Sequence, residues 1–276
     1  MLEKNIKTIV VGVDFSSYSK TVVQQAKLLG KLWKAELVLV HVIQDPVEYS
    51  PALYVPFPNR LSTEHYQNEI KKFYELKGKD AAQVIAKRGA PSDTIIRIAD
   101  EYPHSMIMAG YKGVRPVAEF FFGSTAQALV LKSKHPVWIH RGNKVIKPEK
   151  ILVPHDLSLE SNRSIDVLKD LSLASPVKYE VFFVDQYPFP VLDYKAYTLE
   201  QRRRIDKNFA KIRHLKGEYP NLPFVTAKGN ITNKVVKKAK KFDMLVMAHH
   251  NPSGFFTGSE SVDILKRVNK PALIVQ

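Results

Sequence analysis

Glycines and hydroxyl residues that could cradle a phosphate stand in the stretch MAGYKGVRPVAEFFFGST, residues 108–125. The pattern is G-x2-G-x9-G-[ST], formed by Gly110, Gly113, Gly123 and Ser124, with Thr125 directly after it. Glycines allow a backbone to approach a ligand closely, and the free N–H groups at the start of a helix favour anions. Hydroxyls can donate to phosphate oxygens, and Lys112 and Arg115 add positive charge nearby. The stretch therefore predicts a phosphate-binding loop, with a plain connection between a strand and a helix as the alternative.

Other chemistries fit this stretch less well. It lacks the Gly-Lys-Ser/Thr ending of a Walker A loop and the tight G-x-G-x-x-G spacing of the Rossmann fingerprint. No G-x-S-x-G elbow supports a hydrolase triad built on Ser124. Asp14, at the end of the apolar run TIVVGV, is instead placed to accept a hydrogen bond from a ribose hydroxyl. Adjacent His249 and His250 would face opposite ways on a strand, so a metal pair is not favoured there.

The elements that must position these residues alternate between short apolar runs and helical patterns. In the first half, we predict strands at 7–14, 35–43, 82–89, 105–110 and 136–141, and helices at 17–33, 61–80, 91–102 and 124–133. Continuously apolar runs of this kind are typical of parallel strands buried on both faces. Ser92 and Ser124 are predicted as helix N-caps, with Pro91 beside the first turn.

The second half repeats this order. We predict strands at 150–155, 178–185, 223–228, 243–249 and 271–276, and helices at 159–174, 198–218, 231–242 and 259–268. TIVVGVDFSSYS matches KILVPHDLSLES, so Asp14 corresponds to Asp156, and Gly123-Ser124 corresponds to Gly258-Ser259. Several such landmarks in one order indicate two homologous domains, 1–143 and 148–276.

Alternating strands and helices with this spacing predict an α/β fold with a parallel, doubly wound sheet in each domain. The last strands, PVWIHR and PALIVQ, each follow a proline and lead into no further helix. An unpaired apolar strand at a sheet edge promotes aggregation. We therefore expect the two terminal strands to pair with each other and to make the chain an intramolecular pseudo-dimer.

Composition excludes several classes of protein. The 276 residues are 45% hydrophobic and contain no cysteine, so disulfides and thiolate metal sites are ruled out. The start of the chain resembles neither a signal peptide nor a membrane span, and a cytoplasmic location is expected. The net charge of +15 could attract nucleic acid, lipid or nucleotides. No nucleic-acid-binding signature accompanies it, so solvated helix faces are the favoured interpretation and no specific nucleic-acid partner is predicted.

With these features, the chain resembles a tandem universal stress protein over essentially its whole length. The resemblance is carried by VGVDFS, by VHV at 40–42, by KRGAPSDTII at 87–96 and by the glycine pattern at 110–124. In that family the glycine pattern marks the members that bind ATP. The resemblance implies two flavodoxin-like domains of the adenine nucleotide alpha hydrolase-like type, each with a five-stranded sheet. It also leaves open a homodimer of the tandem chain.

Carried over by position, the resemblance implies roles for particular residues. Gly12, Val13 and Asp14 would line the adenosine pocket, and Val42 would contact adenine through its backbone. The remaining contacts, to ribose and phosphates, would come from the loop residues Ala109, Gly110, Lys112, Gly113, Gly123, Ser124 and Thr125. Mg²⁺ or Mn²⁺ could accompany the phosphates, because such cations bind largely through phosphate oxygens.

The second domain departs from the pattern. His249 stands where the first domain has Gly110, and Pro252 stands roughly where it has Gly113. A side chain and a rigid ring remove two places where the backbone could approach a phosphate. We therefore predict one ATP per chain, held by the first domain.

The predicted function is that of a cytoplasmic stress-response protein with a nucleotide-dependent regulatory or protective role. No residue stands out as a general base for attack on the γ-phosphate, so no catalytic residue is assigned. Two alternatives stay open. One is a small-molecule or lipid-binding module that uses the second domain and the Phe-rich loop before Gly258, and the other is a slow ATP hydrolase.

Overall fold

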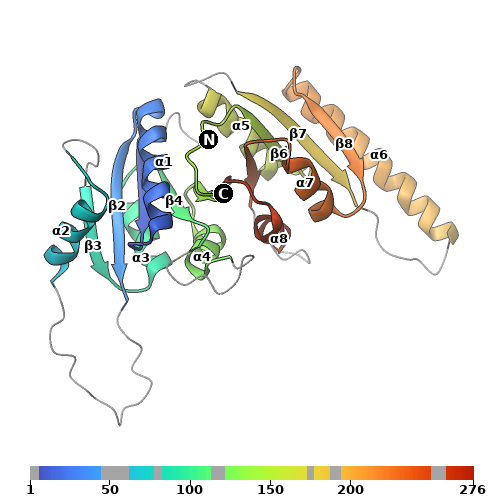
Figure 1. Cartoon of the computed structure of the whole chain (residues 1–276). Helices are drawn as coiled ribbons and strands as arrows, with labels where there is room; N and C mark the ends of the chain where they lie inside the picture. The colour runs from blue at the N-terminus through green and yellow to red at the C-terminus, as the bar shows by residue number, and fades with distance from the viewer. Residues whose placement is uncertain are drawn as a thin grey trace, which may run out of the picture. The chain divides into compact units, whose positions relative to one another are not determined.

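The structure, a computed structural model, describes residues 6–44, 62–77, 83–112, 122–172, 177–186, 194–249 and 259–276. The chain divides into two compact units, one reaching Lys147 and the other starting at Pro148 (Figure 1). Each unit is an α/β fold with helices around a parallel sheet, as predicted.

The first unit contains five strands and four helices among its described residues. The strands are β1 (Thr8–Val13), β2 (Glu36–Ile43), β3 (Gln83–Arg88), β4 (Ser105–Gly110) and β5 (Val137–His140). The helices are α1 (Ser17–Trp33), α2 (Thr63–Phe73), α3 (Pro91–Asp100) and α4 (Ser124–Lys132). The strands are parallel and lie in the order β3-β2-β1-β4-β5.

The second unit repeats this arrangement. Its strands are β6 (Lys150–Pro154), β7 (Lys178–Asp185), β8 (Phe224–Lys228), β9 (Met244–Ala248) and β10 (Ala272–Val275). Its helices are α5 (Leu159–Ser172), α6 (Tyr194–Glu218), α7 (Ile231–Ala239) and α8 (Ser259–Arg267). The strand order β10-β9-β6-β7-β8 is that of the first unit read from the other edge. The two doubly wound sheets predicted from the repeat are therefore present.

The central strands are buried on both faces, as their continuous apolar runs indicate. In the first unit the side chains of Ile9, Val10 and Val11 on β1 are fully shielded from solvent. Their counterparts on β6, Ile151, Leu152 and Val153, are equally shielded.

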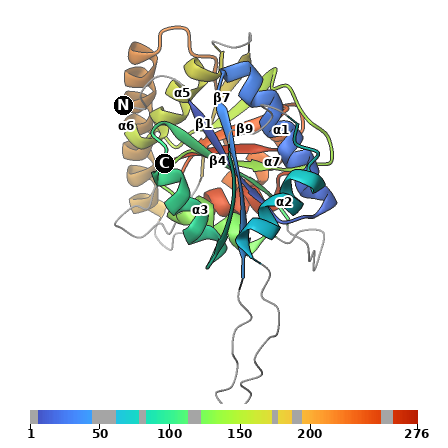
Figure 2. The same cartoon turned by 90° about the vertical axis from the view of Figure 1, so that its left-hand side faces the viewer.

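The strand order reverses direction between β1 and β4. The chain passes from β1 to β2 and β3 on one side, then returns to place β4 and β5 on the other. Figure 2 shows α1 and α2 on one face of this sheet and α3 on the other. Such a reversal separates the loops that leave the carboxyl ends of the two strands, and it is where open α/β sheets bind ligands.

The predicted element boundaries differ from the structure at a few helix ends. The helix expected at 61–80 ends at Phe73, because Glu75 adopts a left-handed φ of 51°. The prediction that Ser92 and Ser124 are helix N-caps is wrong. Ala90 caps α3, because Pro91 occupies the first helical position, and Gly123 caps α4; neither cap uses a side-chain hydrogen bond.

Candidate functional site

A cavity of about 680 Å³ opens at the carboxyl edge of the first sheet, where the strand order reverses. β1, β2 and β4 end at it, and α4 begins there. The structure brings ten of the eleven predicted site residues to its wall: Gly12, Val13, Asp14, Val42, Ala109, Gly110, Lys112, Gly123, Ser124 and Thr125. The eleventh, Gly113, lies outside the described residues, as does Arg115.

The turn from β1 into α1 fixes the Asp14 carboxylate. Its Oδ1 accepts from the Ser16 backbone N–H at 3.0 Å and from the Ser16 hydroxyl at 2.6 Å. Ser16 in turn caps α1 by accepting from the Ser19 N–H. Phe15, between Asp14 and Ser16, has a left-handed φ of 59°, which is unusual for a bulky residue. Asp14 is thus part of a strained, well-braced turn in which Oδ2 makes no hydrogen bond to the part of the chain that the structure describes.

Tyr74, directly after α2, bonds the backbone where β1 ends. The Phe15 N–H donates to the Tyr74 hydroxyl at 3.0 Å, and the Tyr74 hydroxyl also bonds the Ser19 hydroxyl. The last register pair of these strands is Val13 with His41. Val42, one residue further along β2, lies beyond this last pair and lines the cavity.

Gly12 and Gly110, near the ends of β1 and β4, have different neighbours in the space that a side chain would occupy. A Cβ on Gly12 would lie 2.9 Å from Ile95 Cδ1, the far end of a flexible side chain. A Cβ on Gly110 would lie 2.9 Å from Tyr18 Cε1 and 3.2 Å from the Lys112 carbonyl oxygen. Gly110 is thus required first by protein packing, whereas the sequence pattern assigned it to a ligand alone.

The base of the glycine loop is closed by hydrogen bonds. The Tyr111 N–H donates to the His140 carbonyl, and the Gly123 N–H donates to the Tyr111 carbonyl at 3.0 Å. The buried ring of Tyr111 stacks on Phe122 with centroids 5.0 Å apart, and the Arg141 guanidinium lies 3.8 Å above it. Phe122 is therefore buried in the domain, whereas Phe120 and Phe121 lie outside the described residues.

The closed base positions the N-terminus of α4 against the cavity. The first backbone N–H groups of a helix have no partner inside it, and they carry the positive end of its dipole. The first turn of α4 contains no acidic residue, and Ser124 and Thr125 lie in it. Lys112 reaches the same cavity from the end of β4. This end of the cavity can bind an anion.

The opposite end of the cavity is aromatic, which sequence analysis did not anticipate. His41 of β2 and Tyr66 of α2 both line it, and their rings are stacked with centroids 5.6 Å apart. Tyr66 belongs to the apolar stripe of α2 with Ile70 and Phe73, at spacings of four and three residues. That stripe is a signal for burial, but only the fold shows that its first turn reaches the end of β2.

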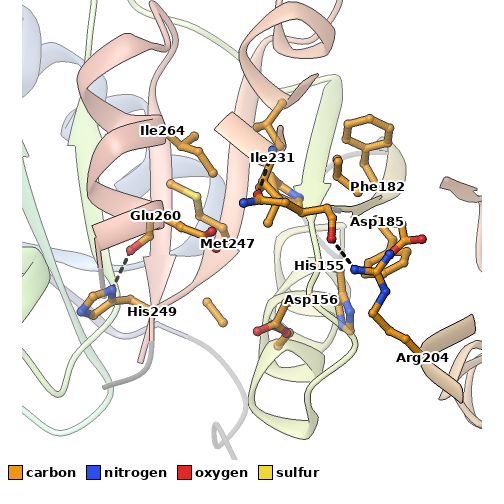
Figure 3. Close-up of a pocket in the computed structure, with 18 residues that line it drawn as sticks. His155, Asp156, Phe182, Asp185, Arg204, Ile231, Met247, His249, Glu260 and Ile264 are labelled. Carbon is orange, nitrogen blue, oxygen red and sulfur yellow. Dashed lines mark hydrogen bonds and ion pairs between the residues drawn. The ribbon is translucent and has the colours of Figure 1, made fainter. Parts of the chain in front are cut away.

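The second unit has a smaller cavity of about 390 Å³ at the corresponding sheet edge (Figure 3). Asp156 repeats the Asp14 turn: its Oδ1 accepts from the Ser158 N–H at 2.9 Å, and Leu157 has a φ of 64°. Arg204 of α6 is held at the end of β7, 3.3 Å from Asp185 Oδ1 and 2.6 Å from the Gln186 carbonyl oxygen. Arg204 and Asp185 thus place an ion pair in the wall of the second cavity, at the end of β7.

The helix N-terminus of the second cavity carries its own negative charge. Glu260 lies in the first turn of α8, where Thr125 lies in α4. Burial, and then the charges of Asp156 and Asp263, raise the pKa of Glu260. His249, in the place of Gly110, is buried and bonds the Ser261 hydroxyl at 2.7 Å. Pro252 and Gly258 lie outside the described residues.

Two further histidines, His155 in the second cavity and His135 away from both cavities, have structural roles. His155 accepts from the Leu157 N–H at Nδ1 and meets Asn162 at Nε2, and burial lowers its pKa. A Ser105–His135–Asp100 chain joins α3 to the amino end of β4, away from both cavities. Its serine is buried and donates to the Ala99 carbonyl, so it is not a nucleophile. Within the described ranges, no group of three or more His, Asp or Glu residues could hold a metal ion.

Comparisons with known proteins agree on one family. A model described as the Universal stress protein family matches residues 5–141 and again residues 148–276. The universal stress protein MJ0577 of Methanocaldococcus jannaschii is 26% identical over 152 residues, covering 48% of this chain and 93% of that protein. The universal stress protein YxiE of Bacillus subtilis is 29% identical over 144 residues, covering 48% and 97%.

Solved structures share the fold over nearly the whole chain. A universal stress protein from Archaeoglobus fulgidus superposes with a TM-score of 0.63 at 16% identity and covers 98% of both chains. A functionally unknown protein from Pseudomonas aeruginosa gives a TM-score of 0.69 at 14% identity, covering 98% of this chain and 92% of that one. At such identities the likeness concerns the fold alone.

Proposed function

This chain belongs to the universal stress protein family, and from that premise we propose that it binds one ATP per chain, in the cavity of its first domain. The observation that carries the proposal is the contrast between two equivalent helix N-termini. The first turn of α4 has no acid and faces a cavity with Lys112, whereas the first turn of α8 contains Glu260 beside Asp156. A triphosphate is attracted by the first arrangement and repelled by the second.

The cavity suggests how the nucleotide would lie. The phosphates would bind the N–H groups and hydroxyls at the start of α4, with Lys112 as counter-charge. Asp14 would accept from the ribose through Oδ2, because its Oδ1 is already engaged. The adenine amino group would then meet the backbone of Val42 at the end of β2. Mg²⁺ or Mn²⁺ would be held mainly by phosphate oxygens, because Asp14 is the one carboxylate among the cavity's described lining residues.

The biological part of the proposal follows from the family. We propose a regulatory or protective role in the stress response, in which ATP occupancy is the signal. A cytoplasmic location and a homodimer of the tandem chain are parts of the same proposal. Among the described residues, no helix is both long enough and apolar enough to cross a bilayer.

Calorimetric titration of the full chain with ATP tests this function. The expected stoichiometry is one, and Asp14→Asn should weaken binding by about 10-fold through loss of a charged acceptor. Asp156→Asn is the matched control, because Asp156 braces the same turn in the second unit. Two bound nucleotides, none, or equal effects of the two substitutions would each reject the proposal.

A further inference from the structure

Tyr66 stands at the aromatic end of the first cavity, opposite the N-terminus of α4. It lies on α2 one turn before Ile70, whose side chain has no exposed surface. α2 packs on β3, at the outer edge of the sheet. The helix is thus anchored by its buried middle, while its first turn carries Tyr66 to the cavity wall.

The His41 ring stacks against the Tyr66 ring and is itself held in a fixed orientation. Its Nδ1 lies 2.9 Å from the Val13 carbonyl oxygen, and a carbonyl can only accept, so this nitrogen carries the hydrogen. The Phe15 ring meets His41 edge-on with centroids 4.7 Å apart, and Tyr66 stacks on it with an interplanar angle of 27°. The stack is therefore held by a hydrogen bond and by packing on the β1 turn.

We propose that the nucleotide base stacks on this wall, and that Tyr66 is the residue that sets affinity for the base and the preference for purines over pyrimidines. The inference rests on the proposed function, because it assumes a nucleotide in this cavity. Every base has a π-face, and stacking on an aromatic side chain strengthens with the overlap that a two-ring purine provides. A flat ring beside the Val42 backbone suits the flat face of a base better than a sugar or a phosphate.

The competing explanation is that Tyr66 only covers His41. Under that explanation, removing the ring would disturb the site as a whole, and all parts of a ligand would bind less well. Under the stacking explanation, only the part of the ligand that carries the base loses affinity. Inorganic tripolyphosphate, which has no base, separates the two because it would bind only at the α4 end.

The experiment measures ATP, CTP and tripolyphosphate binding to the full chain by calorimetry. Tyr66→Ala and Tyr66→Leu should weaken ATP by about 10-fold and bring ATP and CTP to similar affinity, while tripolyphosphate binding is unchanged. Tyr66→Phe should keep the wild-type values, because it keeps the ring. Asn68→Ala is the matched control: Asn68 lies two residues further along α2, is exposed and does not line the cavity.

The outcomes separate this inference from the function on which it rests. Wild-type protein that binds ATP, with unchanged affinity in Tyr66→Ala, overturns the stacking role and leaves the ATP site standing. Equal loss of ATP and tripolyphosphate in Tyr66→Leu also overturns it, in favour of a packing role. A wild-type chain that binds no ATP overturns both. Melting temperatures of the variants close to that of the wild type confirm that the fold is intact.

Discussion

Gly12 and Gly110 line the same cavity, yet they are constrained by neighbours of different stiffness. The neighbour of Gly12 is the terminal carbon of Ile95, which can move by a rotamer change. Gly110 faces the ring of Tyr18, whose hydroxyl donates to the His140 carbonyl at 2.8 Å, and a backbone oxygen. The same residue type at two equivalent strand ends thus tolerates change to different degrees.

We expect Gly110→Ala to destabilise the first domain by about 1–3 kcal/mol, because the tethered ring cannot move away from the new methyl group. Gly12→Ala should cost clearly less. Urea denaturation of both variants measures the difference in the free energy of unfolding. A larger cost for Gly12→Ala would show that Ile95, and not Tyr18, is the rigid neighbour.

His140 on β5 makes the stability of the protein sensitive to acid. Burial lowers the pKa of this histidine from 6.5 to about 4. Between these values the unfolded chain binds a proton that the folded chain does not, so stability falls as the pH falls. The loss amounts to about 3 kcal/mol at full effect. Denaturation of wild type and His140→Gln between pH 4 and 7 checks this, and the variant should show the shallower dependence. Parallel pH curves would contradict it.

At the scale of elements, the start of α4 allows a capping role of Ser124 to be tested against the ligand-binding role that we propose for it. Ser124 was predicted as the N-cap, but Gly123 holds that position and Ser124 is exposed in the first turn without a capping bond. A serine that caps a helix is worth about 1 kcal/mol, whereas one in the first turn contributes little to stability.

Ser124→Ala should therefore leave the free energy of unfolding within about 0.5 kcal/mol of the wild type. ATP affinity should fall several-fold if, as we propose, the hydroxyl donates to a phosphate. Ser16→Ala is the comparison, since Ser16 does cap α1 and its loss should lower stability. A stability loss in Ser124→Ala equal to that in Ser16→Ala would count against this assignment.

The elements were largely predictable because their signals are local. The apolar runs of β1 and β6 and the start of α1 at Ser17 follow from composition and spacing alone. The register that brings Gly110 beside Tyr18, and α2 over the end of β2, depends on contacts between distant segments. For that reason the sequence placed Gly12 and Gly110 at the cavity but did not show that Gly110 packs against Tyr18. It also did not single out Tyr66 as a residue of the cavity wall. The prediction of Ser124 as the N-cap was wrong because the cap is the residue whose ψ is still extended, here Gly123 with a ψ of 136°, and the sequence pattern does not specify that angle.

At the scale of the molecule, one fold occurs twice, and the two copies differ at the start of the helix that follows their fourth strand. Both units keep the Asp turn with a left-handed residue after it, at Phe15 and at Leu157. They differ where a ligand would be held: Glu260 replaces Thr125, and His249 replaces Gly110. The turn is thus common to both units, and we propose that the differing positions decide which ligand each cavity accepts.

We expect ATP to protect amide hydrogens at the start of α4, residues 124–126, from exchange with deuterium. The equivalent amides at the start of α8, residues 259–261, should exchange at the same rate with and without ATP. Hydrogen-exchange mass spectrometry of the full chain measures both segments in one experiment. Equal protection at the two helix starts would show that Glu260 does not exclude the triphosphate.

The start of α4 is held in place by backbone groups alone. The Tyr111 N–H joins the end of β4 to the His140 carbonyl on β5, and the Gly123 N–H joins the cap of α4 to the Tyr111 carbonyl. Backbone hydrogen bonds do not depend on which side chain a residue carries. This part of the domain can therefore stay in place while the side chains around the cavity diverge from one member of the family to another.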